Sequence, residues 1–133
     1  MTGTPESDLI AHRLEQARKA LQEATLLRAA GHLLGTVNRA YYSMFYSIQA
    51  LLVRGGRRTS KHTGVISLFD REFIRTGLFD RDFSKWLHEL FELRQDADYG
   101  DMFIVTGEQG QQALDHARMF LAKVEEFLQV SSD

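Results

Sequence analysis

The chain has 133 residues, of which 44% are hydrophobic and 26% are charged, and its formal net charge is −2. This length and composition are typical of one globular domain that spans residues 1–133. The absence of cysteine excludes disulfide bonds and thiolate metal sites, and the slightly negative charge excludes a protein coated in basic charge for nucleic acid.

The N-terminal part is predicted to form an amphipathic helix. Pro5 is tolerated in the first turn of a helix, and the acidic Glu6 and Asp8 complement the partial positive charge there. Apolar residues then recur every three or four positions, and Gly31 is typical of the position just after a helix. Because the same acidic residues stand where a secretory signal would carry basic charge, we expect a cytoplasmic protein.

Residues 38–53, NRAYYSMFYSIQALLV, are predicted to form the central helix. Two neighbouring stripes run along it, made of Val37, Tyr41, Met44, Ile48 and Leu52, and of Tyr42, Phe45, Gln49 and Val53. A helix that is apolar around most of its circumference is buried on several sides. Because spanning a membrane takes about 20 apolar residues, this segment is too short and too polar to do so. We expect it to begin between His32 and Val37 and to end at Gly55-Gly56.

A basic loop follows this helix. The phosphate-binding candidates in it are Arg57, Arg58, Lys61 and His62. These side chains form either an edge that grips phosphate beside the N-terminus of the next helix, or a solvated loop. Ser60 is a candidate N-cap for that third helix, which is predicted to run for about four turns and to end near Gly77.

Two further helices complete the predicted fold. The fourth begins at Asp80 or Asp82 and ends at Gly100. The fifth begins at a capping box, in which Thr106 is followed three residues later by Gln109. The predicted fold class is therefore all-α, an up-and-down-type bundle of five helices joined by short loops.

Arg94 is the most informative residue of the fourth helix. The apolar face of that helix consists of Phe83, Trp86, Leu87 and Leu90. Arg94 lies almost at the centre of this face, and a buried guanidinium needs a carboxylate or a phosphate as its partner. Asp98, one turn later, is the nearest carboxylate. Two interpretations stay open, a structural Arg94–Asp98 pair and an anion-binding role for Arg94.

The remaining candidates are tyrosines, since the sequence offers no metal or cofactor site. Tyr99 at the end of the fourth helix either donates to a phosphate or packs, and Tyr42 either packs or reaches the groove that holds Arg94. The histidines at positions 12, 32, 62, 88 and 116 contain no pair at helical metal-ligand spacing. We therefore expect neither a metal nor a cofactor.

Several of these residues form an ordered set of motifs that resembles the HEPN domain family. The motifs are Asn38-Arg-Ala-Tyr-Tyr-Ser-Met-Phe, Gln49-Ala-Leu-Leu, Lys61-His62-Thr-Gly-Val, Phe69 and Leu93-Arg-Gln-Asp-Ala-Asp-Tyr99. The resemblance is to the branch of small stand-alone HEPN proteins, and it covers most of the chain, from about residue 9 to about residue 128, with the same order of five helices.

The resemblance implies a homodimer in which the arginine-bearing helix ends of two subunits line a shared cleft. Many HEPN proteins are metal-independent ribonucleases that use an arginine followed by a histidine. Others pair with a minimal nucleotidyltransferase as toxin and antitoxin, and that partner can adenylylate a tyrosine near the motif. Here Arg94 is present, but Tyr99 stands where the histidine is expected. A phenol with a pKa of about 10 is a poor general base.

We therefore predict a HEPN-type homodimer that binds RNA or nucleotide phosphate and accompanies a minimal nucleotidyltransferase in a toxin–antitoxin-like pair. Its ribonuclease motif is degenerate or weak. Arg94 and Tyr99 are the catalytic candidates, Asp98 orients Arg94, and His62 is a candidate to replace the missing histidine. The alternative is a non-catalytic dimerisation module in which Arg94 and Asp98 form a structural pair. We expect the Tyr42 side of the central helix to lie at the dimer contact or beside the Arg94 cleft.

Overall fold

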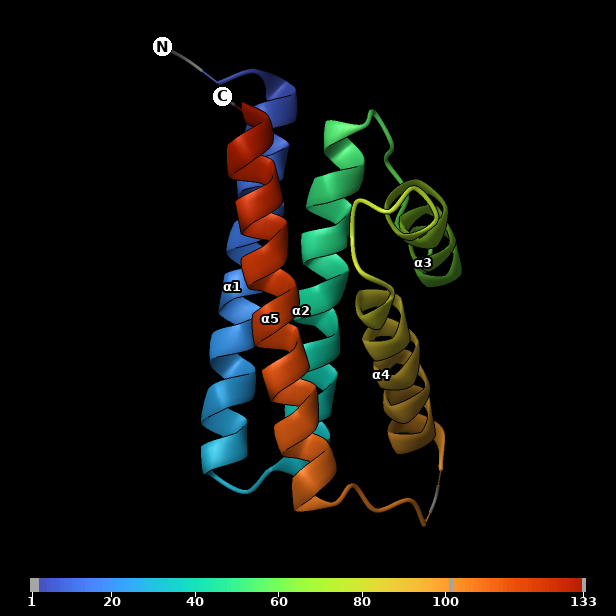
Figure 1. Ribbon diagram of the computed structural model, residues 1–133. Helices are drawn as coiled ribbons and strands as arrows, with labels where there is room; N and C mark the ends of the chain where they lie inside the picture. Colours follow the sequence, from blue (N-terminus) through green and yellow to red (C-terminus); the bar gives the residue numbers. More distant parts are fainter. Residues whose placement is uncertain (1–2, 101, 133) are drawn as a thin grey trace.

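The computed structural model describes residues 3–100 and 102–132 of the chain (Figure 1). Within them lie five α-helices and one π-helical turn: α1 (Pro5–Ala29), α2 (Leu33–Arg54), α3 (His62–Phe69), η1 (Asp70–Ile74), α4 (Arg81–Tyr99) and α5 (Gly107–Ser132). No strand occurs in this part of the chain. The prediction of an all-α bundle is therefore confirmed.

Helix α2 is the centre of the bundle, because it contacts each of the other four α-helices. Figure 1 shows α1 and α4 running one way and α2 and α5 the other, with the short α3 beside the C-terminal half of α2. Eight apolar α2 residues are at most 1% exposed: Val37, Ala40, Tyr41, Met44, Ile48, Ala50, Leu51 and Leu52. Burying one large apolar side chain contributes about 1.5–3 kcal/mol, so α2 is the principal source of core stability.

The helix ends largely follow the predicted signals. Helix α1 begins at Pro5 as predicted, and a reciprocal Thr4–Ser7 capping box that was not predicted precedes it, with the Ser7 N–H donating to Thr4 Oγ1 at 3.0 Å. The Thr106 and Gln109 side chains accept from each other's backbone N–H groups at 3.1 and 3.0 Å. Asp80, rather than Asp82, caps α4. These local side-chain bonds satisfy N–H groups that a helix N-terminus leaves unpaired.

The third helix differs from its prediction. Its N-cap is Lys61, and no side chain caps it, so the prediction of Ser60 as the cap is wrong. After Phe69 the backbone changes to the wider π-helical turn, in which the Arg75 N–H donates to the Asp70 carbonyl at 2.9 Å. The Asp70 carboxylate accepts from Ser84 of α4 at 2.7 Å. This tertiary bond ties the turn to α4, which no local pattern in the sequence shows.

Candidate functional site

Arg94 lies on the side of α4 that faces α2, and only 15% of its side chain is exposed. Its Nε donates to Asp98 Oδ2 at 3.2 Å, and the Asp98 side chain is 37% exposed. The pair that the spacing favoured therefore forms. This contact to a partly solvated carboxylate, together with the side-chain hydrogen bond to Tyr41, leaves most of the five N–H donors of the guanidinium free to bind something else.

Two tyrosine rings of α2 hold the cation. The guanidinium carbon of Arg94 is 5.1 Å from the ring centroid of Tyr41 and 5.3 Å from that of Tyr42. The negative face of an aromatic ring attracts a cation, by about 0.5–1 kcal/mol at an exposed site and by about 2 kcal/mol where water is excluded. The rings thus offset part of the cost of burying Arg94 without neutralising its charge.

His62 reaches the same cluster from the first position of α3. Its Nδ1 is 2.8 Å from the Tyr41 hydroxyl, and its ring stacks on Phe45 with the centroids 4.3 Å apart. Burial, and then the charge of Arg94, lower the pKa of His62. Because the ordinary pKa of histidine is about 6.5, the ring is neutral at pH 7. We call Arg94, Tyr41, Tyr42, Phe45 and His62 the Arg94 cluster.

Tyr41 is a protonated phenol within this cluster. Burial raises the pKa of Tyr41, and this effect exceeds the opposing effect of the Arg94 charge. The hydroxyl therefore keeps its proton and occupies His62 Nδ1, which leaves Nε2 as the ring nitrogen that can meet a ligand. With Nδ1 as the acceptor, Nε2 carries a proton and donates; with Nδ1 as the donor, Nε2 is a base.

The other predicted site residues lie outside the cluster. Lys61 is exposed beside His62, and Arg57 and Arg58 are exposed in the loop before α3. Tyr99 is 78% exposed and lines a shallow hollow with Gln95, Asp96, Gly100 and Phe103. Five positions along an α-helix correspond to a rotation of about 140°, so Tyr99 points away from the face that carries Arg94.

Sequence reasoning assigned Tyr41 and Phe45 to the core or to a spare face and did not connect them with His62. The signal was present in part, because Tyr41 and Tyr42 lie four and three residues before Phe45, which are the spacings of neighbours on a helix surface. We predicted that the Tyr42 side of the central helix lies at the dimer contact or beside the Arg94 cleft. Tyr42 does lie beside Arg94.

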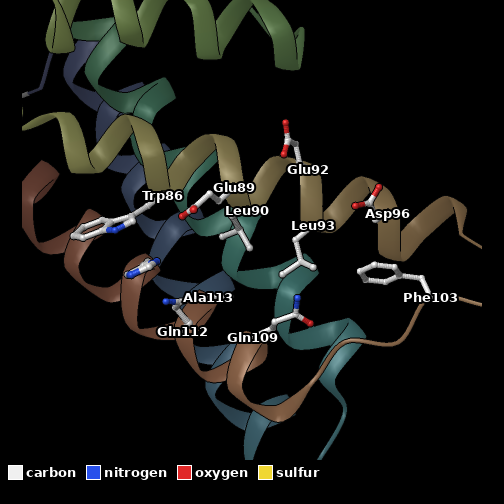
Figure 2. A pocket seen from close by; sticks show the side chains of 11 residues that line it. Trp86, Glu89, Leu90, Glu92, Leu93, Asp96, Phe103, Gln109, Gln112 and Ala113 are labelled. Atoms are coloured by element: carbon white, nitrogen blue, oxygen red, sulfur yellow. The ribbon is translucent and has the colours of Figure 1, made fainter.

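A hollow of about 360 Å³ lies on the other side of α4, between this helix and α5. In Figure 2, Leu90 and Leu93 point from α4 toward α5, whereas Glu92 points away. Its lining includes three acidic residues, Glu89, Glu92 and Asp96. Among the described residues, no lysine or arginine lines it. At one end the Trp86 and His116 rings stack with centroids 4.3 Å apart. This acidic groove does not favour phosphate.

Two further classes of site find no support in residues 3–100 and 102–132. No group of three or more acidic residues or histidines is placed so that it could hold a metal ion. None of the helices in this part has the length and apolar character needed to cross a membrane.

Comparisons with known proteins place these observations in a family. The family model for the HEPN domain matches residues 10–127. A "UPF0332 protein" from Thermotoga maritima is 35% identical over 121 residues, which is 91% of this chain and 92% of that protein. "Putative toxin MJ0142" from Methanocaldococcus jannaschii is 33% identical over 86% of this chain and 78% of its own length. "Putative toxin MJ0605" from the same organism is 32% identical over 90% of this chain and 84% of its own length.

Proposed function

The chain belongs to the HEPN domain family, and we propose that it is a toxin-like HEPN protein that binds RNA or nucleotide phosphate at the Arg94 cluster. Two of its relatives carry the word toxin in their names, which supports the first half of this proposal. The second half rests on the chemistry of the cluster. A metal-independent ribonuclease activity is the enzymatic form of the same proposal.

One observation carries the proposal: a largely buried guanidinium whose main neighbours are aromatic rings. Arg94 is 15% exposed, yet its one carboxylate partner is partly solvated. The faces of Tyr41 and Tyr42 hold the cation in place while keeping its charge available. Hydrogen bonds between arginine and a phosphate are charge-assisted and often bidentate. A phosphate group thus completes the coordination that the protein leaves open.

His62 decides whether binding leads to cleavage. Cleavage by attack of a ribose 2′-hydroxyl needs a base for that hydroxyl and an acid for the leaving oxygen. The neutral His62 has Nε2 for one of these roles, and the protonated Tyr41 holds Nδ1. One imidazole in one tautomer serves one role per step, so we propose tight binding with slow turnover. Cyclic-phosphate ends formed from RNA in the presence of EDTA measure that turnover.

The test of binding is Arg94→Ala, with Arg81→Ala as a matched control. Both arginines lie on α4, but Arg81 is exposed at its N-terminus. We expect Arg94→Ala to weaken binding of a short single-stranded RNA at least tenfold while the helical circular dichroism is kept, and Arg81→Ala to change it less than threefold. Equal affinities for the wild type and Arg94→Ala would refute the assignment of the site.

The Arg94–Asp98 contact favours a second candidate, a non-catalytic interaction module. In that case the pair exists to order the helix end, and Asp98→Asn destabilises the fold without any effect on RNA. In the binding account, the same change leaves Arg94 held by its rings, so RNA affinity stays the same or rises. Measuring both stability and RNA affinity of Asp98→Asn therefore separates the two candidates.

We also propose a homodimer that meets at the end of α4. Three large apolar side chains are exposed there: Tyr99 at 78%, Met102 at 90% and Ile104 at 80%. Neighbouring apolar residues left in water are typical of an interaction surface. Light scattering should give twice the monomer mass for the wild type and the monomer mass for Ile104→Glu. A monomeric wild type would exclude this dimer.

The partner in this proposal is a minimal nucleotidyltransferase, in a toxin–antitoxin-like pair. In the single chain, before the proposed dimer covers it, the phenol of Tyr99 is exposed and accessible to adenylylation by such an enzyme. Co-expression with a nucleotidyltransferase encoded beside the gene should give a co-purifying complex and, with ATP, an adenylylated peptide that contains Tyr99. Tyr99→Phe should lose the modification but still bind the partner.

A further inference from the structure

A second basic site lies near the C-terminal end of α2. It is a hollow of about 330 Å³. Its lining comes from α1, from α2 and from the loop before α3: Leu9, Arg13, Gln49, Leu52, Val53, Arg57, Arg58, Thr59 and Ser60. Three of these nine residues are arginines, and no carboxylate belongs to the lining among the described residues. The hollow is therefore strongly positive.

Arg13 is incompletely satisfied in this hollow. Its Nη1 donates to Gln16 Oε1 at 2.9 Å. Its Nε is buried and has no hydrogen-bond partner in residues 3–100 and 102–132. A buried donor without a partner costs about 1–3 kcal/mol. Arg13 also forms no ion pair within the described residues, so its charge stays unneutralised at the hollow.

The two loop arginines add charge that is poorly neutralised. Arg57 pairs with Glu72 Oε2 at 3.1 Å, but Arg71 shares the same oxygen at 3.2 Å. Arg58 forms no ion pair within the described residues. Gln49 Nε2 donates to the Thr59 carbonyl at 3.2 Å, which fixes this loop to α2 and holds its arginines at the hollow.

We propose that this arginine hollow binds a second phosphate group of the same single-stranded RNA whose first phosphate lies at the Arg94 cluster. The inference rests on the proposed function. Tyr42 and Phe45 belong to the Arg94 cluster, and Gln49 and Val53, farther along the same stripe of α2, line the hollow.

The spacing along α2 fits an extended strand. A rise of 1.5 Å per residue separates the two ends of the stripe, Tyr42 and Val53, by about 16 Å. A mononucleotide is too short to satisfy arginines at both places, whereas a strand with several phosphates along one helix face reaches them. The backbone of a single strand is commonly followed by a basic groove with aromatic side chains beside it, and this face of α2 presents both.

The test compares RNA ligands of two lengths on three variants. Arg13→Gln/Arg58→Gln removes charge from the hollow, Arg94→Ala removes the first site, and Arg54→Gln changes an α2 arginine that does not line the hollow. We expect the double variant to bind a dinucleotide as the wild type does, but an octanucleotide about tenfold more weakly. Its salt slope for the octanucleotide should be smaller by about 1.4, because each lost contact on a single strand accounts for about 0.7.

The outcomes separate this inference from the proposed function. If Arg94→Ala loses both ligands while the double variant binds the octanucleotide with unchanged affinity and salt slope, the hollow is not a strand site but the proposed function stands. If the wild type binds neither ligand at low salt, the proposed function fails first. Arg58→Gln alone, at an exposed position, should give about half the change in slope, so the test does not depend on the folding of the Arg13 variant.

Discussion

The two sides of α4 have opposite chemistry, although one helix provides both. Toward α2 and α3, Arg94 lies among Tyr41, Tyr42 and His62. Toward α5, the groove of Figure 2 carries Glu89, Glu92 and Asp96 along its lining. A polyanion is therefore attracted to one side and repelled from the other. A protein with a net charge of −2 thus carries the phosphate site that we propose on one side of α4 only.

Each side also contains a histidine stacked on a larger ring, and the two respond to opposite charges. His62 lies on Phe45 and His116 on Trp86, each with ring centroids 4.3 Å apart. Burial lowers the pKa of both. The charge of Arg94 lowers the pKa of His62 further, whereas Glu89 and other acids partly oppose the effect of burial on His116. The surrounding charge, rather than the stacking, distinguishes the two sides.

Reversing the charge at the centre of the cluster should have the largest effect. Arg94→Glu places a carboxylate beside Asp98 and against two ring faces, so we expect the free energy of unfolding to fall by about 3 kcal/mol and RNA binding to be lost. Glu89→Gln on the groove side should change the free energy of unfolding by less than about 0.5 kcal/mol. Urea denaturation measures both, and an unchanged stability for Arg94→Glu would show that the rings do not hold the cation.

Removing the hydroxyl that positions His62 should have the next largest effect. Tyr41→Phe leaves Nδ1 of a partly buried ring without its 2.8 Å partner, at a cost of about 1–2 kcal/mol. Tyr46 is a half-buried tyrosine of the same helix, so Tyr46→Phe is the matched control and should stay within about 0.5 kcal/mol of the wild type. Equal losses for the two variants would remove any special role for the Tyr41–His62 bond.

The pH dependence of stability should reveal the lowered pKa of His62. In the unfolded chain the ring titrates at about 6.5, while the folded protein favours the neutral ring. Its contribution to stability is therefore complete above pH 6.5 or so and is lost as the pH falls toward the folded-state pKa. Thermal unfolding between pH 5 and pH 8 should show a smaller acid-side decrease for His62→Phe than for the wild type.

Salt should have the smallest effect, and its sign should differ between the two sides. Screening weakens the influence of Arg94 on His62 and of the acids on His116. Added salt should raise the pKa of His62 and lower that of His116. Histidine resonances followed by NMR in low and high salt test this directly; shifts of the same sign at both rings would contradict the proposed electrostatic difference.

The elements of the fold could be predicted because their signals are local. Pro5, Gly31 and the Thr106–Gln109 box act within one or two turns, and the apolar stripes of α2 directly reflect burial. Arg94 was recognised for the same reason, since a cation on an apolar face conflicts with its surroundings. The Arg94–Asp98 pair likewise follows from a spacing of four residues.

The remainder of the site depends on long-range packing. His62 meets Tyr41 across 21 positions, and its place is set by the loop before α3 and by the turn η1 that Ser84 ties to α4. The acidic groove depends in the same way on how α4 and α5 are spaced, which brings Trp86 onto His116. From the sequence alone, Arg94 and the residues of the basic loop could only be grouped together as phosphate-binding candidates. Which of them lie close together could not be predicted, because side-chain direction in a loop has no periodicity.

The most direct measurement is an NMR titration of the wild-type protein with a short single-stranded RNA at low salt. His62, Tyr42 and the Arg94 Nε–H report on one side of α4, and His116 and the Trp86 indole N–H report on the other. We expect RNA to shift the first set, with the Arg94 Nε–H moving most, and to leave the second set in place. Shifts confined to Trp86 and His116, or none in either set, would contradict phosphate binding at the Arg94 cluster.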